Sequence, residues 1–172
     1  NLYKKIIKID KHFPYAHLNT AVIMLNKEEF LDGWKFYEYR TKCEDMFRLL
    51  KSSKPEVQSF NTSDKTIFIW AEQGIGDQII YASLLFDAFK TKNKFYVSVD
   101  SRLISLFKRS FSQFDNVTFI SADEKLLESK YDFHLPMGSL GKFFRNSTQD
   151  FDAHPIAYLK ADQIQVDSLK KK

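Results

Sequence analysis

The chain has 172 residues, of which 44% are apolar and 16% aromatic, so it can bury a substantial core and is not disordered as a whole. Its net charge of +4 comes from 26 basic and 22 acidic residues spread along the chain, which argues against the concentrated basic face of a nucleic-acid-binding protein. The single cysteine excludes an internal disulfide and fits a cytoplasmic location, and no apolar run is long enough for a transmembrane helix.

Residues 1–43 predict helices. Phe13–Pro14 separates an apolar stripe near the start from a second helical pattern, and Asn26–Lys27 predicts a turn before a third pattern over residues 28–42. Consecutive short helices of this kind are typical of a helical-hairpin repeat, with an ordinary helical pair as the alternative. Residues 44–64 contain two loop-like stretches and are interpreted as a linker.

From Lys65 to the end, apolar runs alternate with amphipathic ones. Strands are predicted at 66–71, 95–99, 117–120 and 132–136, and helices at about 77–90, 102–110, 123–128 and 138–144. This alternation predicts a parallel sheet with right-handed crossovers. The first strand is the most apolar, so we expect it inside the sheet. The fold class is therefore α/β, with a Rossmann-like domain over residues 65–172.

The turn after the first strand is the first candidate site. It reads Glu72-Gln73-Gly74-Ile75-Gly76-Asp77 and lies at the carboxyl end of a strand, where ligands of such sheets bind. Glycine permits a positive φ or the close approach of a ligand, and the amides at a helix start bind phosphate or carboxylate. Ile79 replaces the third glycine of the dinucleotide fingerprint, and no phosphate-binding loop is present, which argues against a nicotinamide or ATP enzyme.

Asp77 has two interpretations at this stage. It lies at or near the start of the predicted helix, where an aspartate commonly serves as the N-cap. Alternatively, its carboxylate faces a cleft and accepts a proton from a substrate hydroxyl, as a general base does.

Two further residues are expected at the same edge of the sheet. His134 ends the fourth predicted strand, and Ser139 lies in the turn that follows. His134 either lines the site or is a buried histidine that bonds to the backbone, and Ser139 is either an N-cap or a ligand donor. None of the four histidines has metal-ligand spacing, so no metal is expected.

Three segments, residues 33–40, 71–79 and 131–140, together resemble bacterial tetratricopeptide-repeat proteins with a glycosyltransferase-like C-terminal region. That region is similar to the heptosyltransferase type of the two-domain GT-B architecture. In the repeat, Ala21 and Gly33 match the small positions and Tyr37 the aromatic position. Glycine follows Ser139-Leu140 in this chain, whereas many relatives have proline there.

The resemblance implies a function for the chain and roles for individual residues. Residues 65–172 would be the acceptor-side half of a GT-B fold, with Asp77 as catalytic base and with Glu72, Gln73, Gly74, Gly76, His134 and Ser139 as substrate-binding residues. The partners would be a nucleotide-sugar donor and a hydroxyl acceptor, with no cofactor. Because the chain starts without Met and lacks a donor half, we expect a fragment that is inactive alone. The alternative is a non-catalytic scaffold, whose helical repeats bind a protein and whose α/β domain is degenerate.

Overall fold

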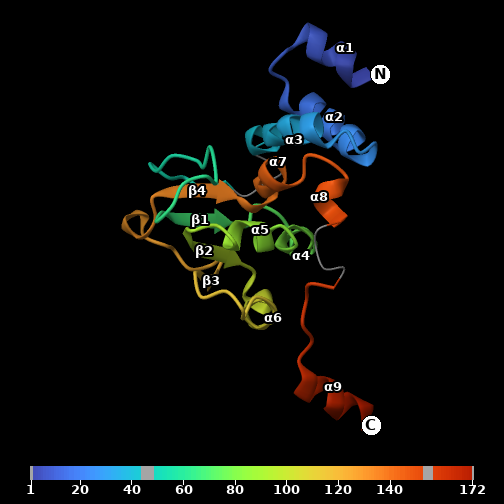
Figure 1. The fold of residues 1–172 in the computed structure, drawn as a ribbon. Helices are drawn as coiled ribbons and strands as arrows, with labels where there is room; N and C mark the ends of the chain where they lie inside the picture. Colours follow the sequence, from blue (N-terminus) through green and yellow to red (C-terminus); the bar gives the residue numbers. More distant parts are fainter. Residues whose placement is uncertain (1, 44–48, 153–156, 172) are drawn as a thin grey trace.

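The computed structural model describes residues 2–43, 49–152 and 157–171. In Figure 1 the first helices stack on one end of a sheet-containing body, and the last helix extends from the opposite end. The whole is an α/β protein built on one open parallel sheet.

The helical region contains α1 (Leu2–Ile9), α2 (Pro14–Asn26) and α3 (Phe30–Tyr37), followed by the 3₁₀ turn η1 (Glu38–Lys42). Proline occupies the first position of α2, where its missing N–H costs nothing. A Cβ atom on Gly33 would lie 2.8 Å from the Leu25 side chain, so α2 and α3 approach closely at that glycine. The predicted helices are confirmed, except that the third changes to 3₁₀ geometry after Tyr37.

The sheet contains β1 (Thr66–Trp70), β2 (Lys94–Val99), β3 (Val117–Ser121) and β4 (Phe133–Pro136). Its order is β3-β2-β1-β4 and every pair is parallel, so β1 lies inside the sheet, as its composition predicts. Ile67 pairs with Phe95 on one side and with Phe133 on the other. The four predicted strands and their parallel pairing are confirmed.

The two faces of the sheet are covered differently. Side chains alternate between faces along a strand, so Ile67 and Ile69 enter the main core while Phe68 and Trp70 point to the other face. The helices whose apolar residues pack in the main core are α4 (Ile75–Ala82), α5 (Leu85–Phe89), α6 (Ile104–Ser110) and α7 (Gly141–Phe144). The second face has a smaller apolar cluster that includes Phe68, Trp70 and Tyr131, and no helix covers it among the described residues; strand residues and the loop residues Leu50 and Leu126 pack against it.

The connection from β3 to β4 explains this difference. The helix predicted at 123–128 is wrong, because this connection contains only the 3₁₀ turn η3 (Glu128–Lys130). Leu127 is 61% exposed, so the segment has no continuous apolar stripe to bury against the sheet. The backbone N–H of Ser53 donates to Glu128, which ties the loop to the segment before β1.

Other predicted helices occur in modified form. The helix predicted at 77–90 begins at Ile75 and is divided into α4 and α5; between them, the Ser83 hydroxyl donates to the carbonyl of Ile80. The turns η2 (Ser101–Leu103) and η4 (Met137–Leu140) precede α6 and α7. Two helices were not predicted, namely α8 (Gln149–Asp152) and α9 (Gln163–Lys170).

The predicted linker is part of the α/β body where the structure describes it. Val57 and Phe60 are buried in the main core. The Val57 N–H donates to the His134 carbonyl at 3.0 Å, and the His134 N–H donates to the Pro55 carbonyl at 3.1 Å, so this segment lies along the free edge of β4. Residues 44–48 of the predicted linker lie outside the described residues.

Candidate functional site

The strand order places a crevice between β1 and β4. The chain moves outward from β1 through β2 to β3 and then returns to the other side of β1, so the connections diverge at the carboxyl ends of β1 and β4. Ligands of open α/β sheets bind at such a switch point. Residues 71–77 follow β1 there, and residues 137–140 follow β4, which is where the sequence predicts the site.

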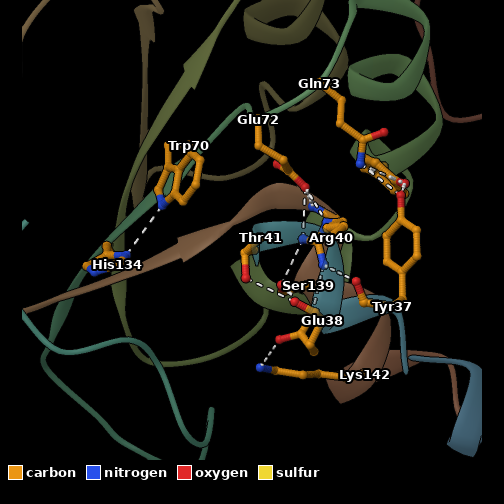
Figure 2. Close-up of polar contacts among 12 residues, drawn as sticks. Tyr37, Glu38, Arg40, Thr41, Trp70, Glu72, Gln73, His134, Ser139 and Lys142 are labelled. Carbon is orange, nitrogen blue, oxygen red and sulfur yellow. Dashed lines mark hydrogen bonds and ion pairs between the residues drawn. The ribbon is translucent and has the colours of Figure 1, made fainter. Parts of the chain in front are cut away.

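Arg40 of η1 joins the segments that follow β1 and β4, and Figure 2 shows its contacts with Glu72 and Ser139. Its side chain is fully buried, and its Nε and Nη2 atoms donate to Oε1 of Glu72 at 3.1 and 2.9 Å. Nη2 also donates to the Ser139 hydroxyl at 2.8 Å. Two of the predicted substrate-binding residues, Glu72 and Ser139, therefore hold the helical region against the sheet.

Two more charges complete this group, which we call the Arg40 cluster: Glu38, Arg40, Glu72, Ser139 and Lys142. Glu38 accepts hydrogen bonds from Nη1 of Arg40 at 2.9 Å and from the Ser139 hydroxyl at 2.6 Å, and it pairs with Lys142. Burial raises the pKa of Glu38, but the positive charges of Arg40 and Lys142 outweigh that effect and leave the pKa below its ordinary value. The cluster thus pairs two carboxylates with two cations.

Gln73 also contacts the helical region. Its Nε2 donates to the Tyr37 hydroxyl at 2.8 Å, and that hydroxyl lies 2.5 Å from the hydroxyl of Tyr81 on α4. Burial, together with the neighbouring Tyr37, raises the pKa of Tyr81, so the Tyr81 phenol stays neutral at physiological pH. Gln73 therefore belongs to the same contact between α3 and α4.

The second half of the turn is different. Gly74 is the N-cap of α4 and Asp77 lies within the first turn, so the interpretation of Asp77 as the N-cap is wrong. Asp77 is half-buried and makes no hydrogen bond or ion pair among the described residues. Its carboxylate lies over the start of the helix, since a Cβ atom on Gly74 would come within 3.6 Å of Oδ2.

The glycines of the turn do not have the positive φ that glycine permits. No described glycine has a positive φ, and Gly74 has φ −65°. A Cβ atom on Gly76 would meet nothing within 4 Å, so open space lies beside it. The close approach of a ligand at Gly76 stays a prediction.

His134 lies apart from this turn. It pairs with Phe68 two positions before β4 ends, so it lies within the sheet and not at its carboxyl edge. It is buried on the second face, where the Trp70 indole donates to its Nδ1 atom at 3.3 Å. Burial lowers the pKa of His134. The structure thus supports the interpretation of His134 as a buried histidine, with the Trp70 indole as its side-chain partner.

Sequence reasoning missed Arg40. It contacts Glu72 and Ser139, which are 32 and 99 positions away in the chain, and no local pattern marks an arginine that becomes buried this way. A signal was present in the block Glu38-Tyr39-Arg40, where charges follow the aromatic face of a helix, but it does not identify the partner. The described residues contain no group of three or more acidic, histidine or cysteine side chains that could hold a metal ion.

Comparisons with known proteins add no identification. No protein-family model matches the chain, no curated protein matches it, and no solved structure matches it. Within the part of the chain that the structure describes, no helix is long and apolar enough to cross a membrane.

Proposed function

We propose that this chain is the acceptor-side part of a GT-B-type glycosyltransferase, which moves a sugar from a nucleotide-sugar to a hydroxyl acceptor. The observation that carries the proposal is the state of Asp77. Among the acidic side chains of the turn, Glu72 is committed to Arg40, whereas Asp77 is without a partner beside the open space at Gly76. The parallel sheet, the glycine turn at its carboxyl edge and the resemblance of residues 71–79 support the same function.

The chemistry requires a proton acceptor at that position. The acceptor hydroxyl oxygen would form a bond to the anomeric carbon while the bond from that carbon to the nucleotide diphosphate breaks, and the electron pair leaves with the diphosphate. Asp77 would take the proton of the attacking hydroxyl. A positioned general base of this kind contributes about 10²–10⁴-fold in rate. The proposal needs no cofactor and no metal ligand from this chain.

The substitution Asp77→Asn in the full-length protein tests the proposal. Because Asp77 caps nothing and bonds to no described residue, the variant should keep the melting temperature and lose about 10²–10⁴-fold in turnover. Asp115→Asn is the matched control, since Asp115 is an exposed aspartate in the loop before β3 and should leave turnover unchanged. Near wild-type turnover of Asp77→Asn would remove Asp77 from the mechanism.

A scaffold function is the second candidate, and one observation favours it. The helix α1 has no buried residue, and Leu2 and Ile9 are 68% and 87% exposed. An apolar helix face of this kind is suited to binding a protein through the helical repeats. The two functions differ in one measurement: a scaffold would show no turnover of nucleotide-sugars even as the full-length protein. Cytoplasmic location stays a prediction.

A further inference from the structure

The Arg40 cluster determines where cavities lie at the carboxyl edge of the sheet. With Arg40 joining the segments that follow β1 and β4, space is left at the ends of β1, β2 and β3 instead. Two cavities lie there, and both are bordered by Ala71, Ala122 and Asp123. Their shared border makes them neighbouring compartments of one site.

The larger compartment has a volume of about 490 Å³ and lies on the second face of the sheet. Its wall contains the buried aromatic side chains of Phe68, Trp70 and Tyr131, together with Ser98, which pairs with Trp70 on the neighbouring strand β2. It exists because the connection from β3 to β4 forms no helix over this face. Its volume lies within the range of small-molecule pockets, and its wall is suited to a flat ring.

The smaller compartment, of about 160 Å³, is polar. Its lining includes Glu72, Gln78, Asp100, Ser101 and Asp123. Gln78 is buried and braces the wall, because its Nε2 donates to the carbonyl of Gln73 at 3.0 Å and its Oε1 accepts from the N–H of Asp100 at 2.8 Å. Gln78 thus fixes the backbone at Gln73 and Asp100 in this wall before any ligand binds.

Glu72 supplies an independent indication of a ligand. Its Oε1 atom accepts from Arg40 and from the N–H of Gly138, but its Oε2 atom is buried and has no hydrogen-bond partner in the structure. Leaving a carboxylate oxygen buried and unpaired costs free energy, and such atoms are rare in folded proteins. Glu72 also lines the smaller compartment, so the residue that carries this unsatisfied acceptor forms part of the wall that a ligand would meet.

We propose that the two compartments together bind a neutral polyol that carries a ring, with the ring against the aromatic wall and its hydroxyls directed to the carboxylates. Glu72 is paired with Arg40 and Asp100 with Arg102, so Asp123 is the carboxylate of this lining with no ion pair among the described residues, and its negative charge disfavours a phosphate or carboxylate there. The two lysines that line the larger compartment, Lys51 and Lys125, are balanced there by the carboxylates of Glu124 and Glu128. The site rests on the cavities, and only the identification of its ligand as the glycosyl acceptor rests on the proposed function.

Two probes that share a nitrophenyl ring but differ in charge test, on this chain itself, whether the site binds a neutral ligand and excludes an anion. Neutral 4-nitrophenyl glucoside should shift the backbone amide resonances of residues 68–73, 98–101 and 122–131 in a titration followed by NMR. The anion 4-nitrophenyl phosphate should leave these resonances in place. Equal binding of the two compounds, absence of shifts with the glucoside, or shifts confined to residues 137–140 would each overturn the proposal.

Two variants separate the compartments. Ser98→Phe places a ring in the larger cavity and should abolish glucoside binding. Asp123→Asn, at an exposed residue that the fold does not need, should weaken binding about tenfold, the effect of losing one charged hydrogen bond. Asp115→Asn is the matched control and should bind as the parent does. If Ser98→Phe does not fold, Asp123→Asn alone decides, and unchanged binding by that variant contradicts the proposal.

The test of glucoside binding is independent of the test of catalysis with Asp77→Asn. Glucoside binding together with full turnover of Asp77→Asn would leave the ligand site in place and remove the proposed catalytic role. Loss of turnover in Asp77→Asn without any glucoside binding would support the catalytic role and remove the proposed ligand site.

Discussion

At the scale of single residues, Arg40 is the side chain on which the contact between the helical region and the sheet depends. Removing one partner of a buried ion pair leaves the other buried without compensation, which costs about 3–5 kcal/mol. We therefore expect Arg40→Ala to lower the free energy of unfolding, measured with urea, by about that amount. Arg102→Ala is the control, because Arg102 pairs with Asp100 in solvent and its loss should be undetectable.

A second substitution shows whether the cost comes from the uncompensated carboxylate. In Arg40→Met combined with Glu72→Gln, both charges are gone and much of the lost stability should return. If Arg40→Ala costs no more than Arg102→Ala, the Arg40 cluster does not stabilise the fold.

His134 makes the stability of the protein depend on pH. Burial lowers its pKa in the folded state below the ordinary value of about 6.5, so the unfolded chain takes up the proton first as the pH falls. The contribution of the neutral imidazole is therefore complete above about pH 6.5 and decreases below it. His134→Gln should flatten this part of the curve of unfolding free energy against pH. His12→Gln, at an exposed histidine, should retain the slope, and an unchanged slope in His134→Gln would contradict the assignment.

Sequence reasoning reached these residues unevenly. Glu72, Gln73, Gly76 and Asp77 were identified because a strand, a glycine turn and a helix are local patterns. The sequence did not predict that Glu72 and Gln73 contact the helical region while Gly76 and Asp77 do not. The Glu72 contact depends on Arg40, which comes from another region of the chain. Distant contacts of this kind leave no trace in local periodicity.

At the scale of elements, strands were easier to predict than helices. Each buried strand needs a short apolar run, and β1 to β4 all have one. The helical segments were located correctly in the main, but the apolar pattern does not distinguish α from 3₁₀ turns at η1, η2 and η4. The helix predicted at 123–128 failed because the expectation of a crossover helix was stronger than the apolar pattern in that segment.

The glycine at position 141, where the resemblance leads one to expect proline, has a structural reason. A Cβ atom there would lie 2.5 Å from the indole of Trp34, so a larger side chain at the start of α7 displaces α3. Gly141→Ala should therefore destabilise the protein by about 1–3 kcal/mol, the usual cost of overpacking. Gly76→Ala is the matched control. Position 76 lies inside α4 and has open space for a Cβ atom, so this variant should stabilise the protein by about 0.5–1 kcal/mol.

Thermal unfolding of the two variants measures both effects. A lower melting temperature for Gly141→Ala and a higher one for Gly76→Ala are expected. Equal effects in the same direction would mean that the close approach of α3 to α7 is not a constraint.

At the scale of the whole molecule, the predicted division into residues 1–43 and 65–172 does not describe two independent bodies. Trp34 donates from its indole to the Arg145 carbonyl at 2.6 Å, Tyr37 contacts Tyr81, and Arg40 contacts Glu72, and all three contacts join the helical region to the α/β body. Figure 1 shows α2 and α3 stacked on the end of the body that carries α7. We therefore expect the two regions to unfold together.

The two tryptophans report on the two regions separately, because Trp34 lies in α3 and Trp70 in β1. Trp70→Phe leaves only the helical reporter, and Trp34→Phe leaves only the sheet reporter. In each variant the urea midpoint from fluorescence should coincide with the midpoint from circular dichroism, as in two-state unfolding. Adding Arg40→Ala to Trp70→Phe should shift the fluorescence midpoint to lower urea than the circular dichroism midpoint, because the helical region is then released first. Adding Arg102→Ala should leave the two midpoints together. If the midpoints already differ in Trp70→Phe alone, the helical region opens by itself, and the Arg40 cluster does not couple it to the sheet.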